Sequence, residues 1–323
     1  MSVEVIASPI RQGFQVTNAW GEPRTKMTLW RLNIKTSARE GFDPRQFCLE
    51  KKLAGVGWPV EDENGHPPMD FEQYLKLGQA QYADSGDNGW RPAVNAIGSR
   101  MKEGDLCWTR DWNGVYYLGR IDGAWQYLHG DEADNFDVHC VRSCKWVRVG
   151  LLDAVPGAVE RSFGPSRTIQ AVNDETADAY SHYVYGQLSC DSTITTNVHS
   201  DIFALLSPLD HEDLAALYLQ ARGYVLIPST IKSSTAAYEW VMFHQETGEK
   251  AVLQVKSGNA WIDVAPLADI PSRVFVVAAE GIAAGSIPAN VTCISREQLL
   301  KFAQERRTLL PERIRRYLEW ASA

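Results

Sequence analysis

The sequence predicts two successive domains of mixed α/β fold, and three observations lead to this prediction. The chain has 323 residues, a length that suggests two domains rather than one. Up to about Gln170 it is rich in tryptophan and in short strand-like runs bounded by Gly, Asn and Asp turn signals. From about Leu205 the residue pattern predicts, in this order, a helix, three strands and then alternating strands and helices.

The strand-like runs in residues 1–170 predict a small β-barrel or twisted sheet with few helices. The clearest of these runs are 106–110, 115–121, 125–128 and 144–150. Residues 171–204 combine a polar helical stretch (174–187) with a Ser/Thr-rich run (189–200). That combination indicates a connector between two domains.

Residues 205–323 predict an α/β domain. Its first helix begins at Ser207 and Pro208, which are typical of a first turn, and stops at Gly223. Between these points apolar residues recur at spacings of three and four. Strands are expected at 224–228, 238–245, 250–256, 274–279 and 291–294, and helices at 296–307 and 311–321.

The composition is that of an ordinary globular protein, with 45% apolar and 22% charged residues. Six scattered cysteines argue against a disulfide framework, and no uncharged apolar run approaches the roughly 18 residues that span a bilayer. The first 16 residues lack the apolar segment of a signal peptide, so we expect a cytoplasmic protein with no membrane partner. The formal net charge of −8 counts against a nucleic-acid partner, although a local basic groove stays compatible with it.

Two predicted strands and the helix before them carry groups suited to phosphodiester hydrolysis. Glu239 begins the second strand, whereas Gln254 and Lys256 lie two residues apart on the third, which places them on one strand face. Glu212, on the preceding helix, can point at the same cluster. A nuclease needs hard oxygen ligands for Mg²⁺ and a cation near the attacking water and the phosphate. These residues therefore predict a metal-dependent nuclease site.

The order of these motifs resembles the Mrr-like branch of PD-(D/E)XK endonucleases. The similarity rests on Glu212 and on residues 219–224, 238–240 and 253–258, and it covers about 205–323. That branch often has Gln where other members have the second acid, as here. The first strand acid is usually Asp in the branch, and this chain has Glu instead.

The resemblance implies a restriction-endonuclease-like α/β domain with defined roles for these residues. Glu239, Gln254 and the Val255 carbonyl would hold Mg²⁺, for which Mn²⁺ can substitute. Lys256 would orient the water and stabilise developing charge. Glu212 would complete the ligand shell or bind a second ion.

Each of these residues also has an ordinary structural interpretation. A Lys at the end of a strand is usually a solvated edge residue, and a Glu in a Tyr-Glu-Trp strand usually belongs to its polar face. Lys256 is the most informative, because a cation that follows the otherwise apolar run 251–255, which Gln254 alone interrupts, requires a reason. If the site is degenerate, the domain is a catalytically inactive module that only binds nucleic acid.

A second set of motifs lies in residues 1–170. In order, they are 30–35, 55–59, 90–95, 101–106, 116–121 and 125–127. Together they resemble an EVE-type domain of the PUA superfamily, a β-barrel fold, although no single motif is diagnostic. The resemblance implies a reader of modified bases, which stacks a flipped base on aromatic faces and bonds its edge.

Six residues are candidates for contacting such a base. Trp58 and Trp90 come first, because each adjoins a turn that contains Gly and Pro. The further candidates are Trp108 and Trp125 as aromatic faces, with Asn95 and Asp105 as partners of the base edge. The alternative interpretation is that most tryptophans of such a domain are core residues.

One further motif, His139-Cys140 with Cys144, lacks a second Cys/His pair at a matching spacing, so zinc is not expected. The combined expectation is a modification-dependent, type IV-like restriction endonuclease that cuts foreign DNA, such as phage DNA, with altered bases. A homodimer is expected, because many nucleases of this type cut two strands as dimers. An inactive reader and a nuclease acting on RNA remain the alternatives.

Overall fold

The structure is a computed structural model. It describes residues 27–34, 37–82, 89–165, 167–190, 202–230, 238–256, 262–278 and 286–322. The chain divides into two compact units, which are treated separately below. Unit 1 comprises residues 1–150 and 162–197, and unit 2 comprises residues 151–161 and 198–323.

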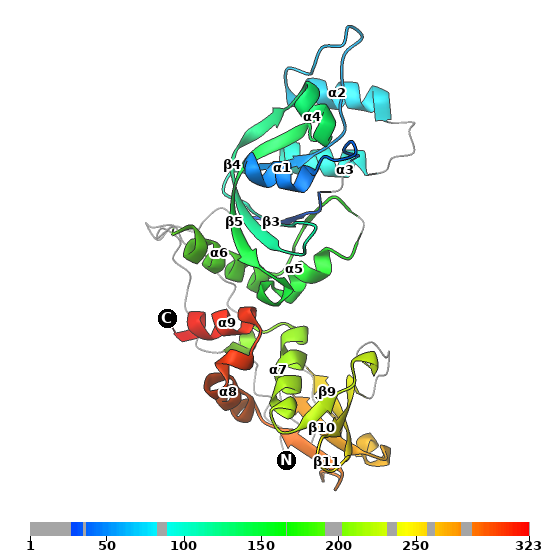
Figure 1. The fold of residues 1–323 in the computed structure, drawn as a ribbon, viewed down its shortest axis with the longest axis vertical. Helices are drawn as coiled ribbons and strands as arrows, with labels where there is room; N and C mark the ends of the chain where they lie inside the picture. Colours follow the sequence, from blue (N-terminus) through cyan, green and yellow to red (C-terminus); the bar gives the residue numbers. More distant parts are fainter. Residues whose placement is uncertain are drawn as a thin grey trace, which may run out of the picture. The chain divides into compact units, whose positions relative to one another are not determined.

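Unit 1 contains a six-stranded mixed sheet (Figure 1). Its strands are β1 (Leu29–Leu32), β2 (Leu53–Val56), β3 (Leu106–Arg110), β4 (Tyr116–Tyr127), β5 (Cys140–Gly150) and β6 (Ile169–Ala171). The order is β2-β5-β4-β3-β1-β6, in which only β1 and β3 pair parallel. Among the described residues no pairing joins the edge strands β2 and β6, so of the two expected forms, a small β-barrel and a twisted sheet, the structure shows an open sheet.

Helices and turns connect and cover these strands. They are α1 (Pro44–Glu50), α2 (Phe71–Tyr82), α3 (Trp90–Asn95), the π-helical turn η1 (Ala96–Arg100), α4 (Asp131–Phe136) and α6 (Glu175–Ser189). Helix α6 falls in the stretch expected to be a connector, but it packs on the sheet of unit 1. Its Ser181 hydroxyl accepts the indole N–H of Trp108 at 2.9 Å, and its Tyr185 hydroxyl donates to the Lys145 carbonyl at 3.2 Å.

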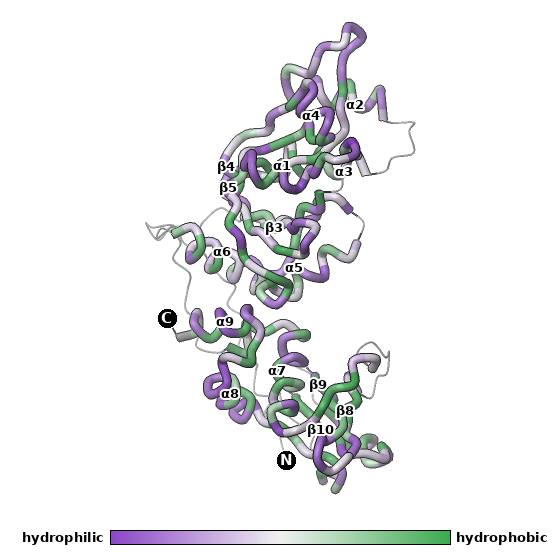
Figure 2. The backbone as a smooth tube through the Cα atoms, in the orientation of Figure 1, coloured by the Kyte–Doolittle hydropathy of each residue, from purple (hydrophilic) through white to green (hydrophobic). Residues whose placement is uncertain are grey.

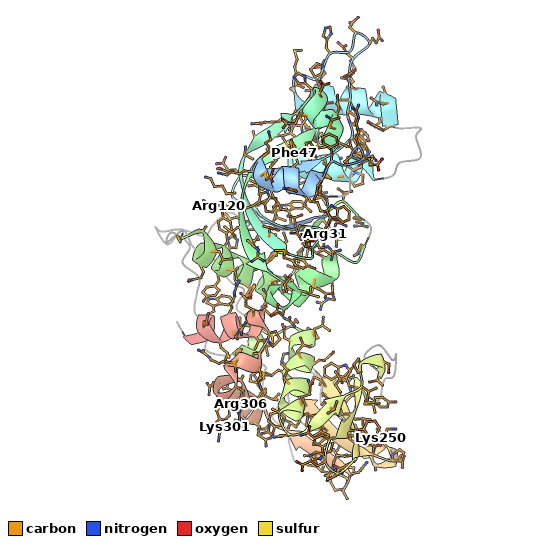
Figure 3. All side chains as sticks on the ribbon, viewed as in Figure 1. Arg31, Phe47, Arg120, Lys250, Lys301 and Arg306 are labelled. Atoms are coloured by element: carbon orange, nitrogen blue, oxygen red, sulfur yellow. The ribbon has the colours of Figure 1, made fainter. Side chains whose placement is uncertain are left out.

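The core of unit 1 consists of apolar and aromatic side chains, and it also contains buried charged side chains such as Arg31. Phe47 of α1, labelled in Figure 3, stacks on Phe136 at the end of α4 with 4.3 Å between ring centroids. Arg31 of β1, also labelled there, is fully buried. Its two terminal nitrogens donate to the Arg167 and Thr168 carbonyls and to the Gln170 side chain of β6, whereas its buried Nε has no partner among the described residues.

Unit 2 contains a five-stranded mixed sheet. Its strands are β7 (Tyr224–Leu226), β8 (Trp240–His244), β9 (Lys250–Lys256), β10 (Arg273–Ala278) and β11 (Val291–Ile294). Its helices are α5 (Gly157–Ser162), α7 (Pro208–Gln220), α8 (Arg296–Glu305) and α9 (Glu312–Ser322), and short 3₁₀ turns are η2 (Leu152–Ala154), η3 (Ile202–Ala204), η4 (Pro228–Thr230), η5 (Ala265–Asp269) and η6 (Arg307–Leu309).

The strand order in unit 2 is β11-β10-β9-β8-β7, with antiparallel pairs from β7 to β9 and parallel pairs from β9 to β11. Strand β9 is therefore central. Its five inner residues are all buried and only its terminal lysines are exposed, as is typical of a strand covered on both faces (Figure 2). The structure shows the predicted helix and the three strands that follow it, but after β9 two strands precede two helices, whereas strands and helices were expected to alternate. The chain is of mixed α/β class. Within the described ranges, no helix has the length and apolar character needed to cross a membrane.

Candidate functional site

Helix α7 positions one of the predicted acids. Ser207 and Asp210 form a capping box at its first turn, which fixes where the helix begins. Arg313 of α9 binds both Asp210 and Asp213, three residues apart on α7. Because Asp210 is fully buried, this ion-pair network fixes the rotation of α7 against α9 and with it the direction of Glu212.

The structure brings Glu212 together with Glu239. Glu239 directly precedes β8, and its main-chain N–H donates to the Leu253 carbonyl of β9 at 2.7 Å. Partial burial, together with the negative charges of Glu239 and Asp213, raises the pKa of Glu212 to about 7. Two carboxyl groups from separate elements therefore share a partly desolvated region, where a proton or a cation is favoured.

Gln254 on β9 is buried without partners. Its side chain is 3% exposed, and neither its amide oxygen nor its amide nitrogen has a hydrogen-bond partner among the described residues. A buried polar group without a hydrogen bond costs about 1–3 kcal/mol of stability. Such a group therefore calls for an explanation other than folding stability, such as a bound ion or a part in catalysis. An amide oxygen held in this way is suited to ligate a cation.

Lys256 ends β9 and is exposed, two residues after Gln254 and hence on the same strand face. Val255 lies between them with a buried side chain, so its main-chain oxygen is the group that can act as a ligand. No contact in the described part of the chain joins Lys256 or Gln254 directly to the two glutamates. The four predicted residues thus form two pairs in the structure: Glu212 with Glu239, and Gln254 with Lys256 on one face of β9.

Oxygen atoms dominate this predicted set, which is the donor type that Mg²⁺ prefers. The described residues contain no group of three or more His, Cys, Asp or Glu side chains arranged to hold a metal ion. The predicted set does not conflict with that finding, because it contains two carboxylates and a neutral amide. Such a set fits a weakly held ion that needs further oxygens from a bound phosphate.

In unit 1, Trp58 is the candidate with the most unusual backbone. It is partly buried and has a left-handed φ of 67°, an outlier for a bulky residue. Tyrosine hydroxyls fix its loop: Tyr74 donates to the Trp58 carbonyl (3.0 Å) and Tyr82 donates to the next carbonyl (2.6 Å). The Tyr127 hydroxyl accepts the main-chain N–H of Val60 at 2.8 Å and donates to the Val60 carbonyl at 2.9 Å. Strain that the surroundings impose in this way is typical of ligand-binding loops.

Trp125 of β4 is also partly buried, and it extends the aromatic surface. Its ring meets Phe71 of α2 edge-on, with 5.1 Å between centroids, and lies 5.7 Å from Tyr74. Its indole N–H is buried on the side of Cys140. Trp58 and Trp125 are therefore both joined to the same tyrosine, Tyr74.

Three other candidates have structural roles, and this corrects their assignment. Trp90 is 3% exposed and Trp108 is fully buried, with its indole N–H bonded to Ser181. Asp105 is buried, and its carboxylate accepts from the Trp30 indole (2.8 Å) and from two main-chain N–H groups. These side chains face the core, so none of them can contact a base in this structure.

Asn95 lies at the end of α3 and is partly exposed, where the backbone widens into the π-helical turn η1. The guanidinium of Arg142 on β5 donates hydrogen bonds to two main-chain carbonyls of this turn, those of Ile97 and Gly98. The same group donates to the Gly123 carbonyl at 2.9 Å. Because π-helical turns are frequent at functional sites, Asn95 stays a candidate for contacting a base.

Sequence reasoning missed the residues that hold these candidates. Tyr74 and Tyr82 lie on α2 and Tyr127 ends β4, so the three hydroxyls converge only in the folded unit. Arg142 is a charged residue in a strand interior, and that alone was a signal that it binds something buried. The scan against protein-family models and the search of curated proteins found no match to this chain.

Proposed function

We propose that the chain is a modification-dependent DNA endonuclease, in which unit 2 cleaves the backbone and unit 1 recognises an altered base. The observation that carries this proposal is the partly buried pair of Glu212 and Glu239 beside a central strand that ends in Gln254 and Lys256. Two acids kept close at a cost, with a lysine and an unpartnered amide nearby, fit a divalent cation and a phosphate.

The chain's own residues supply most of the chemistry. Glu239, the Gln254 amide oxygen and the Val255 carbonyl would hold the ion, and Glu212 would complete the oxygen ligands. Bound Mg²⁺ or Mn²⁺ would supply a Lewis acid for the scissile phosphate. Lys256, exposed at the strand end, would hold the attacking water by hydrogen bonds and offset negative charge that develops on the phosphate.

The finer fold assignments belong to this proposal. The helix and mixed sheet of unit 2 are compatible with the Mrr-like PD-(D/E)XK resemblance, and the strained Trp58 loop supports an EVE-like reader in unit 1. Trp58, Trp125 and Asn95 would contact the base. A homodimer would place two nuclease sites on the two strands of a duplex.

A second candidate function is a reader without catalysis, and one observation favours it. The predicted ligand set has only two carboxylates, since Gln254 is neutral, and the described residues offer no larger group of metal-binding side chains. In that case, unit 2 would bind nucleic acid and leave it intact. A preference for RNA would be a separate outcome of the same assays.

The test is linearisation of a plasmid that carries modified cytosine by the full chain in Mg²⁺ or Mn²⁺. Glu239→Ala and Lys256→Ala should each reduce cleavage at least about 100-fold, because both remove groups at the reacting phosphate. The matched control is Lys250→Ala, which removes the same charge from the opposite, exposed end of β9 (Figure 3). Cleavage that survives both active-site substitutions, or is lost equally in Lys250→Ala, would reject the site.

A further inference from the structure

Arg31 of β1 is a buried cation that no carboxylate of the described residues neutralises. Its side chain is fully enclosed, and the groups whose charges act on it are the Cys107 thiol and two further arginines, Arg110 and Arg167. Burial raises the pKa of Cys107, so this thiol is neutral. Burial, together with the charges of Arg110 and Arg167, lowers the pKa of Arg31 to about 10, so its guanidinium stays charged at neutral pH. A buried charge without a counter-charge is costly.

The Phe163 ring brings a second guanidinium to the same region. The Cζ atom of Arg31 lies 5.5 Å from the centroid of this ring, and the Cζ atom of Arg110 on β3 lies 4.9 Å from it. The hydrogen-bond partner of Arg110 is the Tyr116 hydroxyl at 3.3 Å, which is a neutral group. The ring faces offset only part of two positive charges. The region therefore has a positive potential within a chain whose formal net charge is −8.

Asn33 lies beside the Arg31 guanidinium. Its main-chain N–H donates to the Thr168 carbonyl at 2.8 Å, which continues the pairing of β1 with β6, so the two-residue period places its side chain on the face of Arg31. The same carbonyl accepts a hydrogen bond from Nη1 of Arg31 at 3.3 Å. The Arg31 side chain therefore extends along the sheet to the level of Asn33.

Both side chains have buried polar atoms without a partner. Asn33 is 1% exposed, and neither its Nδ2 nor its Oδ1 has a hydrogen-bond partner among the described residues. The Nε atom of Arg31 lacks one in the same part of the structure. Buried polar atoms of folded proteins almost always have a partner, and where the protein offers none an ion or an ordered water satisfies them. Two N–H donors beside uncompensated positive charge favour an anion.

We infer that Arg31 and Asn33 bind a small inorganic anion of the size of chloride inside unit 1. The Arg31 Nε–H and the Asn33 amide N–H donate to the ion, and the Asn33 oxygen turns away from it. The charges of Arg110 and Arg167 attract the ion from further away. A water molecule would accept the same hydrogen bonds, but it carries no charge to offset the arginines. The site is separate from base reading and from cleavage, and it does not depend on either.

The test is chloride-35 NMR of the full chain, in which chloride replaces gluconate at constant ionic strength. Chloride that exchanges with a protein site has a broadened line, and bromide removes the broadening by competing for the site. Asn33→Asp places a carboxylate where the ion would lie, so the excess linewidth should fall at least about tenfold. The matched control is Asn64→Asp, the same substitution at an exposed turn, which should leave the linewidth unchanged.

Melting temperature is a second readout, and a misfolded variant cannot reproduce the expected result. The wild type should melt about 3–6 °C higher at ten times the chloride dissociation constant than in gluconate alone. Asn33→Asp should melt at or above the wild type in gluconate, because its carboxylate supplies the counter-charge, and should not respond to chloride. Asn33→Leu, which removes the donor and both unpaired atoms, should fold and also lose the chloride response.

Loss of bromide-sensitive broadening in Asn33→Asp and Asn33→Leu, with broadening kept in Asn64→Asp, supports the inference. If Asn33→Asp does not fold, Asn33→Leu decides by the same criterion. Broadening that persists in the folded variants would show that chloride binds elsewhere, and the inference is then wrong. A wild-type chain that gives no bromide-sensitive broadening and no chloride-dependent melting would also overturn it, because water then satisfies these atoms.

Discussion

The substitution Glu212→Gln tests the carboxyl pair of unit 2 without reference to catalysis. The pKa of Glu212 rises from its usual 4.5 to about 7, so the folded chain binds the proton more tightly than the unfolded chain. Stability from this group is therefore present at low pH and is lost as the pH rises from about 4.5 to about 7. At about 1.36 kcal/mol per pKa unit the loss is about 3 kcal/mol, and about 2 kcal/mol after allowing for solvent screening of a partly buried group.

Urea unfolding followed by tryptophan fluorescence at pH 5 and pH 8 measures this effect. Glu212→Gln removes the charge, so the free energy of unfolding should be about 2 kcal/mol higher than wild type at pH 8 and nearly equal at pH 5. Glu305→Gln is the control, because Glu305 is an exposed glutamate on α8 that pairs with Lys301. If Glu212→Gln and Glu305→Gln show the same pH dependence, the pKa of Glu212 is not raised in the folded chain and the premise of the proposed carboxyl pair fails.

Three further predictions follow from the structure. Trp58→Gly should weaken binding of the protein to the modified duplex by about 1–3 kcal/mol, measured by anisotropy. The melting temperature of the Trp58→Gly protein should be equal to or above that of Trp58→Ala, because glycine adopts the left-handed φ without strain. Equal binding by wild type and both variants would show that Trp58 does not contact the base. Calorimetry should detect little Mg²⁺ binding by the free chain and more in the presence of DNA. Gln254→Glu, which replaces the neutral amide by a carboxylate, should bind Mg²⁺ more tightly. No metal binding in any of these states would favour the inactive reader. Arg313→Met should lower the free energy of unfolding by about 3–5 kcal/mol, since it leaves buried Asp210 unpaired; a loss below 1 kcal/mol in urea denaturation would show that this network does not fix α7.

Local signals in the sequence predict much of unit 2. The capping residues at Ser207 and the glycine at Gly223 delimit a helix that the structure places at Pro208–Gln220. The central strand at Lys250–Lys256 and the strand Val291–Ile294 have the predicted bounds, because each is a short apolar run between turn residues. Strand β8 begins at Trp240 rather than at residue 238, since the backbone bends at Glu239.

Long-range contacts decided what the sequence did not predict. Trp90 and Trp108 are as close to turns and polar residues as Trp58 is, and only the packing of α2 and α6 makes them core residues. The three tyrosines around the Trp58 loop and the approach of Asp137 to Gly57 join elements far apart in the sequence. No periodicity or turn signal encodes such contacts.

The most direct measurement of the central claim is cleavage of matched plasmids. The full chain is incubated with DNA that contains cytosine, 5-methylcytosine, 5-hydroxymethylcytosine or N6-methyladenine, in Mg²⁺, Mn²⁺ or EDTA. We predict cleavage of at least one modified plasmid, faster in Mn²⁺, which tolerates an amide ligand and irregular geometry, and none of the unmodified plasmid or in EDTA. Intact plasmids under every condition, or equal cleavage of modified and unmodified DNA, would contradict the proposal.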